Sequence, residues 1–298
     1  METRALGKSG LQVSLVGLGC MNFGAMNDQA QATAIVNRAI ELGVTFFDTA
    51  DVYGNRGTSE QFLGKALGAR RADFSIATKF ASPMSMEQRW MRGGSRRWIM
   101  AAVEGSLRRL GSDYIDLYQM HIADPAVPIE ETLRALDDLV HQGKVRYLGC
   151  SNYAAWQIGD AAWTSREQHL NPFISAQNRY SVLSRDLEKE VVPAVIRYGL
   201  GILPYFPLES GLLSGKYHPG RDFPSDSRLA KWGAWAAASF ASADKLERIA
   251  RLFQLCERFG HSMLELAMGW LAAKPYVSSV IAGVTTVQKL EQNVAAAA

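Results

Sequence analysis

The sequence has few cysteines, no long apolar run and no compositionally biased segment. Its three cysteines, Cys20, Cys150 and Cys256, are odd in number and far apart, which argues against a disulfide framework or a clustered metal site. No apolar core of a signal peptide precedes Lys8, and no later window of about 18 residues is wholly apolar. We therefore expect a cytoplasmic protein with no membrane segment and no bound metal.

The sequence also has little excess of charge of either sign. The chain has 32 Lys and Arg against 29 Asp and Glu, a formal net charge of +3. The basic residues are scattered rather than gathered into a stripe, which argues against nucleic acid as a partner. A hydrophobic fraction of 48% suffices for a large core. The length of 298 residues fits one large barrel or two ordinary domains, and length alone does not choose between them.

Short apolar runs alternate along the chain with longer segments of helical periodicity. This pattern is typical of a parallel sheet in which each strand is followed by a returning helix. Eight strands is the number that closes a parallel barrel, so the sequence predicts one α/β domain, residues 1–298, with a (β/α)8 TIM-barrel fold. The candidate strands are residues 16–20, 44–48, 74–79, 114–121, 145–151, 173–177, 201–206 and 277–282.

The segments between the candidate strands carry helix signals. Asp28 is a favourable N-cap for the first of them, and Gly43 favours the end of that helix. The expected helices cover residues 28–42, 58–67, 95–110, 129–142, 154–162, 186–198, 262–274 and 286–297.

Two segments do not fit the simple alternation. Residues 3–13 precede the first barrel strand and contain the turn Gly7-Lys8-Ser9-Gly10, which predicts a hairpin that plugs the floor of the barrel. Residues 211–260 separate the seventh strand from its helix and are far longer than an ordinary connection. We expect an extra amphipathic helix at residues 243–259 and a loop before it that folds over a ligand.

Polar side chains stand at the ends of three neighbouring candidate strands. Asp48, Lys79 and His121 take these positions, and Tyr53 follows on the loop after Asp48. Because the strands of a parallel barrel end at one face, where such enzymes have their active sites, we expect the four side chains to converge. A carbonyl that receives hydride becomes an alkoxide and needs a proton donor near its oxygen. No side chain can donate hydride, so this chemistry requires a cofactor.

The four side chains suit proton delivery to a carbonyl oxygen. A free tyrosine, with a pKa of about 10, is a reluctant acid. A neighbouring lysine ammonium favours the phenolate, and an aspartate keeps that lysine charged and oriented. Each of these residues alone is more often structural than catalytic, but their joint placement at successive strand ends favours a functional site.

An ordered series of motifs runs through almost the whole chain: residues 4–14, Gly17-Leu18-Gly19, Phe47-Asp48-Thr49-Ala50 with Tyr53-Gly54, Ala77-Thr78-Lys79, residues 113–121, Gly149-Cys150-Ser151-Asn152-Tyr153 and Pro204-Tyr205-Phe206-Pro207-Leu208. This series resembles the aldo-keto reductases, in particular bacterial members similar to the branch of the potassium-channel β subunits. The resemblance implies that Tyr53 is the general acid in reduction and that Lys79 and Asp48 tune it. It also implies that His121 orients the carbonyl and that a nicotinamide cofactor donates hydride.

Family members bind the dinucleotide extended across the barrel mouth. Ser151, Asn152 and Gln177 end the fifth and sixth strands with side chains able to hydrogen-bond a carboxamide, and Tyr205 offers a flat face for the nicotinamide ring. The resemblance further implies cofactor contacts in the first strand-end loop and at Asp48, in the segment that covers the pyrophosphate, and at a basic residue that closes over the cofactor. These residues are Gly19, Cys20, Met21, Asp48, Phe206, Pro207, Leu208, Ser210, Gly211, Leu213, Lys216 and Arg228.

The last signature follows the eighth strand and opens the final helix. Its members are Gly283, Thr285, Lys289, Gln292 and Asn293. Backbone N–H groups at a helix start, a hydroxyl and an ammonium suit a phosphate, so we expect NADPH rather than NADH. In the branch of the channel β subunits a glutamine is usual at the position of Lys289, and a glutamate at that of Gln292. The lysine strengthens the hold on the 2′-phosphate, whereas the lost glutamate weakens the expected adenine contact.

Three alternatives remain open beside an NADPH-dependent reductase of aldehydes and ketones. A doubly wound dinucleotide-binding fold is suggested by Gly17-Leu18-Gly19, although the third glycine of that motif is missing. A barrel lyase would use Lys79 as a Schiff-base nucleophile. A redox-sensing regulatory protein would hold NADPH with little turnover. The carbonyl substrate, the direction of the reaction and the oligomeric state are left open by the sequence.

Overall fold

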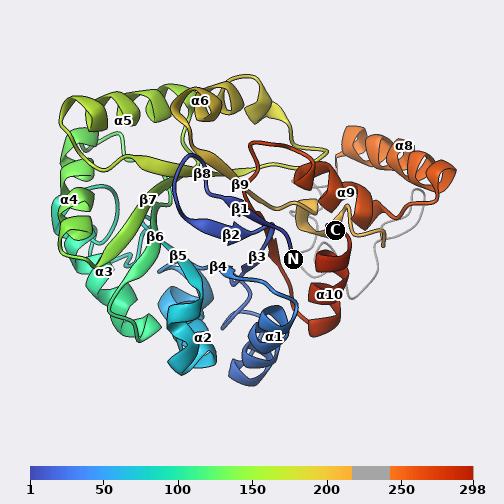
Figure 1. The fold of residues 1–298 in the computed structure, drawn as a ribbon, viewed down its shortest axis with the longest axis horizontal. Coiled ribbons are helices and arrows are strands. Elements are labelled where there is room, and N and C mark those ends of the chain that lie inside the picture. Colours follow the sequence, from blue (N-terminus) through green and yellow to red (C-terminus); the bar gives the residue numbers. More distant parts are fainter. Residues whose placement is uncertain (217–241, 298) are drawn as a thin grey trace.

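Eight parallel strands form a barrel at the centre of the molecule, with helices around it (Figure 1). The computed structural model of the protein describes residues 1–216 and 242–297. The predicted (β/α)8 barrel is confirmed. Its strands are β3 (Val16–Gly19), β4 (Phe46–Asp48), β5 (Ser75–Phe80), β6 (Ile115–Met120), β7 (Val145–Ser151), β8 (Phe173–Arg179), β9 (Gly201–Tyr205) and β10 (Val280–Gly283).

The strands are joined in the order β10-β3-β4-β5-β6-β7-β8-β9. The two outer members of this series also meet. Ile202 N of β9 donates to Tyr276 O (2.8 Å), and Ser278 N donates to Ile202 O (3.0 Å), just before β10. The ring of strands is therefore closed by backbone hydrogen bonds, which excludes the doubly wound open sheet.

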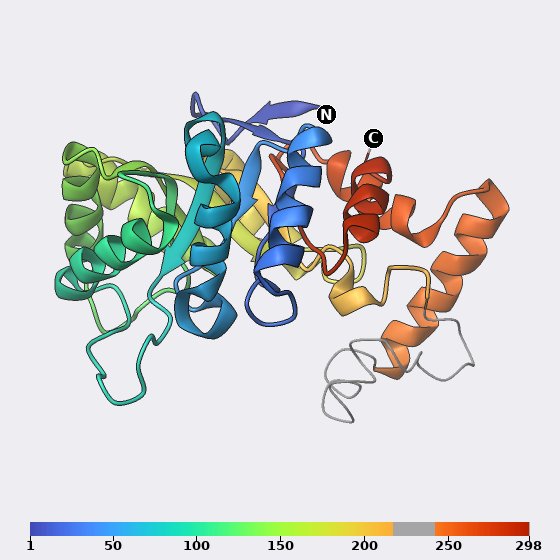
Figure 2. The same cartoon turned by 90° about the horizontal axis from the view of Figure 1, so that it is seen from below.

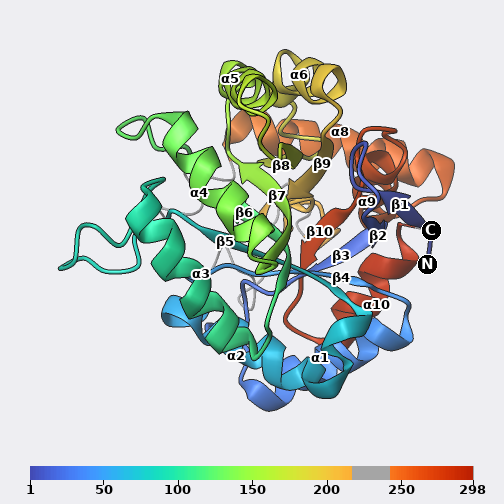
Figure 3. The same ribbon diagram turned by 60° about the vertical axis from the view of Figure 1, so that its left-hand side comes forward.

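The helices lie on the outside of the strands (Figure 3). Asp28 caps the first of them by accepting a hydrogen bond from Gln31 N, as its position predicted. The predicted helix at residues 186–198 is split in two, because Pro193 lacks an N–H and is tolerated only in a first helical turn. The helices are α1 (Gln29–Glu41), α2 (Tyr53–Leu67), η1 (Gly68–Asp73), α3 (Arg96–Leu110), α4 (Ile129–His141), α5 (Ala155–Glu167), η2 (Asp186–Glu188), α6 (Val191–Tyr198), η3 (Glu209–Gly211), α8 (Ala243–Phe259), α9 (Met263–Ala272) and α10 (Val287–Ala295).

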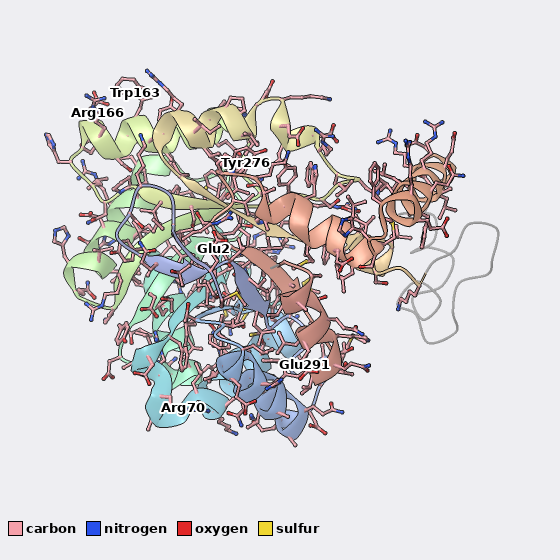
Figure 4. All side chains as sticks on the ribbon, turned by 45° about the vertical axis from the view of Figure 1, so that its right-hand side comes forward. Glu2, Arg70, Trp163, Arg166, Tyr276 and Glu291 are labelled. Atoms are coloured by element: carbon pink, nitrogen blue, oxygen red, sulfur yellow. The ribbon has the colours of Figure 1, made fainter. Side chains whose placement is uncertain are left out.

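The first and last helices of the ring are neighbours. Arg38 of α1 forms an ion pair of 2.7 Å with Glu291 of α10, and Figure 4 shows Glu291 on α10 next to α1. This contact joins the first and last helices on the outer surface of the barrel.

The start of α2 is irregular. Residues 54–57 have φ angles between 59° and 112°, so the right-handed helix begins at Thr58, as the sequence predicted. A Cβ at Gly54 would lie 2.2 Å from Phe23 O, and a left-handed turn this close to another backbone requires glycine. The turn fixes the chain immediately after Tyr53.

The N-terminal hairpin consists of β1 (Thr3–Ala5) and β2 (Gln12–Ser14), paired antiparallel. Figure 2 shows it at the end of the barrel opposite the long loop between β5 and α3. The fully buried Leu6 and Val13 pack inside the barrel floor, as predicted, against Phe46, Ala77, Leu117, Leu203 and Ile281.

The insertion after β9 contains the expected extra helix α8, which lies outside α9 (Figure 1). A second, smaller core joins it to the barrel and contains Leu183, Leu212, Leu213, Ile249, Cys256, Met263 and Ala267. The predicted ligand-covering loop lies largely at residues 217–241, outside the described residues, and Arg228 lies there too. Within the described parts of the chain, no helix is long and apolar enough to span a membrane.

Candidate active site

The four predicted catalytic residues come together at the carboxyl-end face of the barrel. Asp48 ends β4, Lys79 is in β5, His121 follows β6 and Tyr53 starts α2. Lys79 Nζ lies 2.7 Å from Asp48 Oδ2 and 3.5 Å from the Tyr53 hydroxyl. The rings of Tyr53 and His121 meet edge to face, with centroids 5.7 Å apart. The strand-end pattern therefore located these side chains correctly relative to one another.

Lys79 is completely buried. Besides its contacts with Asp48 and Tyr53, its ammonium donates to Thr49 O at 2.8 Å, so all three of its protons have acceptors. Burial lowers the pKa of Lys79, but the charge of Asp48 and the contact with Tyr53 outweigh burial and raise it overall. A buried, charged amine that is fully hydrogen-bonded is a poor Schiff-base nucleophile, which argues against the lyase alternative.

The second carboxylate oxygen of Asp48 is also satisfied. Oδ1 accepts hydrogen bonds from Gln177 Nε2 (2.7 Å) and Gln119 Nε2 (3.2 Å). Gln119 is fully buried, lies opposite Lys79 in the β5–β6 register and was not among the predicted site residues. One signal was available in the sequence, since Gln119 precedes His121 by two positions and alternate residues of a strand share a face.

The pKa values of Tyr53 and His121 shift in opposite directions. Burial raises the pKa of Tyr53, while the neighbouring charge of Lys79 lowers it without cancelling the effect of burial. Burial and the charge of Lys79 both lower the pKa of His121, to about 3. The imidazole is therefore neutral at ordinary pH. Its buried Nδ1 has no hydrogen-bond partner among the described residues.

A cavity of about 620 Å³ extends from these residues across the barrel mouth to the start of α10. This volume lies in the range typical of small-molecule and cofactor sites. The predicted residues that line it are Gly19, Met21, Asp48, Tyr53, His121, Ser151, Asn152, Gln177, Tyr205, Phe206, Pro207, Leu208, Ser210, Gly211, Lys216, Gly283, Thr285, Lys289, Gln292 and Asn293.

The predicted site residues and the residues that line the cavity differ at several positions. Lys79 lies beneath the lining, behind Asp48 and Tyr53. Cys20 and Leu213 are fully buried and do not line the cavity, and Leu213 belongs to the second core. The lining residues that the sequence analysis missed are Asn22, Met26, Ser214, Leu264, Ile281, Ala282 and Val284.

Aromatic and amide groups form the end of the cavity near the four predicted catalytic residues. The Tyr205 hydroxyl donates to Asn152 Oδ1 (2.7 Å), and Asn152 Nδ2 donates to His121 O (3.0 Å) and Ser151 Oγ (3.1 Å). Asn152 has a φ of 58°, a conformation that asparagine tolerates better than most residues. These bonds tie Tyr205 to Asn152 and, through it, to the backbone of His121, and both side chains line the cavity.

The opposite end of the cavity is built from the start of α10. Thr286 caps this helix by accepting from Lys289 N (3.3 Å), and Lys289 Nζ donates to Thr285 Oγ1 (2.9 Å). A helix N-terminus with a hydroxyl and an ammonium attracts phosphate groups. The lining thus suits a dinucleotide, with aromatic and amide groups at one end and phosphate-binding groups at the other.

A closed (β/α)8 barrel with a buried lysine and aspartate, a partly buried tyrosine and a large cavity at its carboxyl-end face is typical of a class of barrel oxidoreductases. The sequence pattern of the Aldo/keto reductase family matches residues 15–298. The chain therefore belongs to the Aldo/keto reductase family.

Three relatives illustrate the breadth of the similarity. The chain is 36% identical to the uncharacterized oxidoreductase YrpG of Bacillus subtilis, over 99% of this chain and 91% of that protein. It is equally similar, with the same coverage, to a probable voltage-gated potassium channel subunit beta of Arabidopsis thaliana. It is 33% identical to the L-glyceraldehyde 3-phosphate reductase of Escherichia coli, over 99% of this chain and 87% of the relative.

Proposed function

We propose that the protein reduces aldehydes, and ketones as a second class, to alcohols with NADPH. The observation that carries this proposal is the position of the Lys79 ammonium, within contact of both Asp48 and the Tyr53 hydroxyl, next to a cavity that fits a dinucleotide. A nicotinamide cofactor, when bound, supplies the hydride. The protein's own residues then have to bind the carbonyl oxygen and protonate it.

Tyr53 is the proton donor in this proposal. As negative charge develops on the substrate oxygen, the phenol transfers its proton, and the neighbouring Lys79 stabilises the phenolate that remains. Asp48 keeps Lys79 charged and in place. His121 is neutral, so it can donate one hydrogen bond to the carbonyl oxygen without adding a competing acid.

The cofactor proposed is NADPH rather than NADH. Lys289 lines the cavity close to the N-terminus of α10, where its ammonium adds to the helix dipole. A 2′-phosphate at this end would gain a charge-assisted contact that the 2′-hydroxyl of NADH does not make.

The proposal is tested by following cofactor oxidation with a panel of aldehydes, including sugar, aromatic and dicarbonyl compounds, with NADPH and NADH in parallel. We expect turnover well above background with at least one aldehyde and a higher kcat/KM for NADPH. Absence of turnover with every aldehyde would contradict the reductase, and equal use of NADH would contradict the cofactor preference.

A second candidate is a redox-sensing regulatory protein that binds NADPH and turns over slowly. It is supported by the similarity to proteins named as potassium channel β subunits of Arabidopsis thaliana and Oryza sativa. Tight NADPH binding without turnover of any aldehyde in the same panel would favour this candidate over the reductase.

A further inference from the structure

Glu209 is a fully buried carboxylate at the start of η3, in the connection after β9. Arg179 at the end of β8 donates two hydrogen bonds to it, from Nη2 to Oε2 and from Nε to Oε1, the latter 3.3 Å long. Ser181 Oγ donates to Oε1 (2.7 Å), and Lys245 Nζ of α8 lies 3.7 Å from Oε2. Burial raises the pKa of Glu209, but the bonds from Arg179 and Ser181 lower it overall, so the carboxylate is charged.

Glu209 belongs to a segment, residues 207–216, that has two kinds of side chain. Ser210, Gly211, Ser214 and Lys216 line the large cavity. Glu209, Leu212 and Leu213 are fully buried and do not line it. We call this segment the strap, because its buried members anchor it while the others form the cavity wall.

The backbone of the strap has an unusual conformation around Glu209. The φ angles are 46° at Glu209, 58° at Ser210 and 101° at Gly211. Two consecutive non-glycine residues in this region persist only where surrounding contacts impose it. Side-chain contacts with Arg179, Ser181 and Lys245 hold the first of them. Its backbone N–H also donates to Phe206 O (2.9 Å). Leu212 and Leu213 anchor the strap in the second core.

Ser210 shows what this conformation presents to the cavity. The residue is only 5% exposed and lines the cavity, and its Oγ has no hydrogen-bond partner among the described residues. A buried hydroxyl that has no such partner is costly unless a ligand group binds it. The strap therefore directs a hydroxyl into the cavity that Tyr205 and Lys289 also line, where it can donate to the diphosphate of a bound dinucleotide.

We propose that Glu209, through Arg179 and Lys245, is a positioning residue that sets the strap and thereby controls how fast the dinucleotide is released. The proposal rests on the proposed function, because it assumes that the cavity binds NADPH. It assigns Glu209 no contact with cofactor or substrate. Its physical basis is that a buried carboxylate joins three elements at once: β8, the strap and the insertion helix α8.

The test compares NADPH release from the full-length protein and from Glu209→Gln, measured by stopped-flow displacement. Glutamine keeps the shape of the side chain but loses the charge that pairs with Arg179 and Lys245. We expect release at least tenfold faster, with hydride transfer in a single turnover at saturating NADPH changed less than twofold. A purely structural role would change both rates or neither.

The matched control is Glu130→Gln, which breaks an exposed pair with Arg134 (3.0 Å) on α4. We expect its release rate to equal that of the wild type. If Glu209→Gln does not fold, Arg179→Lys replaces it, because lysine keeps the charge but not the two-pronged contact. Release at the wild-type rate from the folded variant tested would overturn the proposal.

The experiments distinguish a failure of the Glu209 proposal from a failure of the proposed function. A wild-type protein that neither binds NADPH nor reduces any aldehyde contradicts the proposed function. A wild-type protein that binds NADPH and releases it no more slowly than the Glu209 variant contradicts only the proposed role of Glu209. Trypsin cleavage after Lys216, at the end of the strap, gives a second readout, and we expect Glu209→Gln to be cut faster in the presence of NADPH than the wild type.

Discussion

Tyr53 can be tested as the proton donor by removing only its hydroxyl. Because the phenol acts on the developing alkoxide, Tyr53→Phe should lower kcat by about 10²- to 10⁴-fold and leave the NADPH dissociation constant within about twofold. Tyr118→Phe is the matched control, since Tyr118 is fully buried in the main core and its hydroxyl has no partner among the described residues. A Tyr53 variant with half of normal turnover would place proton delivery elsewhere.

His121 gives a prediction about pH. Burial and Lys79 lower its pKa to about 3, so it stays neutral from pH 5 to 9. The profile of kcat/KM against pH should therefore have no limb near 6.5, the ordinary value for histidine. A limb near 6.5 that disappears in His121→Gln would show that the imidazole does titrate.

Asp51 is buried, and both of its carboxylate oxygens have no partner among the described residues. Burial and the neighbouring Glu60 raise its pKa well above the ordinary value. A carboxyl with a raised folded-state pKa contributes stability that is present below about pH 4 and is lost as the pH rises through the folded-state value. Asp51→Asn, which cannot ionise, should therefore be more stable than the wild type at pH 8 and equally stable at pH 4.

The comparison for Asp51 is Asp116→Asn. Asp116 accepts hydrogen bonds from Arg71 Nη2 (2.7 Å) and Ile76 N (2.9 Å), so its loss should cost about 1 to 3 kcal/mol at pH 8. Thermal or urea unfolding at the two pH values measures both variants. An Asp51→Asn protein less stable than the wild type at pH 8 would mean that the carboxylate is ionised and bound.

The hairpin β1–β2 depends on one glycine. Gly7 has a φ of 60°, and a Cβ there would lie 2.6 Å from Gly199 O and from Gly201 N, and 2.7 Å from Ile174 O. Gly7→Ala should therefore lower the free energy of unfolding by about 1 to 3 kcal/mol or more. Gly10→Ala, in the same turn, meets only Tyr147 Oη at 3.8 Å and should change it by less than about 1 kcal/mol. Equal losses of unfolding free energy in the two variants, measured in urea, would contradict this role of Gly7.

Elements could be predicted from the sequence where their signals are local. The strands β3 to β10 are short apolar runs. Asp28 caps α1 by accepting a hydrogen bond from Gln31 N, only three residues later. The left-handed turn at residues 54–57 was not foreseen, because it depends on the approach of Phe23 from another loop. The bond between Glu209 and Arg179 was not foreseen either, since the two residues are 30 positions apart and only the fold brings them together.

The convergence of the predicted catalytic residues could be foreseen for a different reason than the rest of the cavity lining. Asp48, Lys79 and His121 stand at strand ends, and the barrel rule alone places strand ends at one face. The lining of the cavity by Leu264 of α9 and Met26 of the first loop requires the path of the loops, which one sequence does not specify.

The cavity wall joins parts of the chain that are far apart in sequence. It combines the loop after β3, the ends of β7 to β9 and the start of α10, and the first and last barrel strands, which pair with each other, both contribute to it. A ligand that contacts all of these parts binds only the folded barrel and stabilises it as a whole. At a concentration one hundred times its dissociation constant, such a ligand adds about 2.7 kcal/mol.

This linkage provides a test of Lys289 that is independent of turnover. The melting temperature of the wild type should rise more with NADPH than with the same concentration of NADH, because the ammonium pairs with the 2′-phosphate. In Lys289→Met the two cofactors should give equal rises. Lys189→Met, which changes a lysine that is 79% exposed beside Asp186, should keep the wild-type difference. Equal shifts with both cofactors in the wild type would show that the start of α10 does not read the 2′-phosphate.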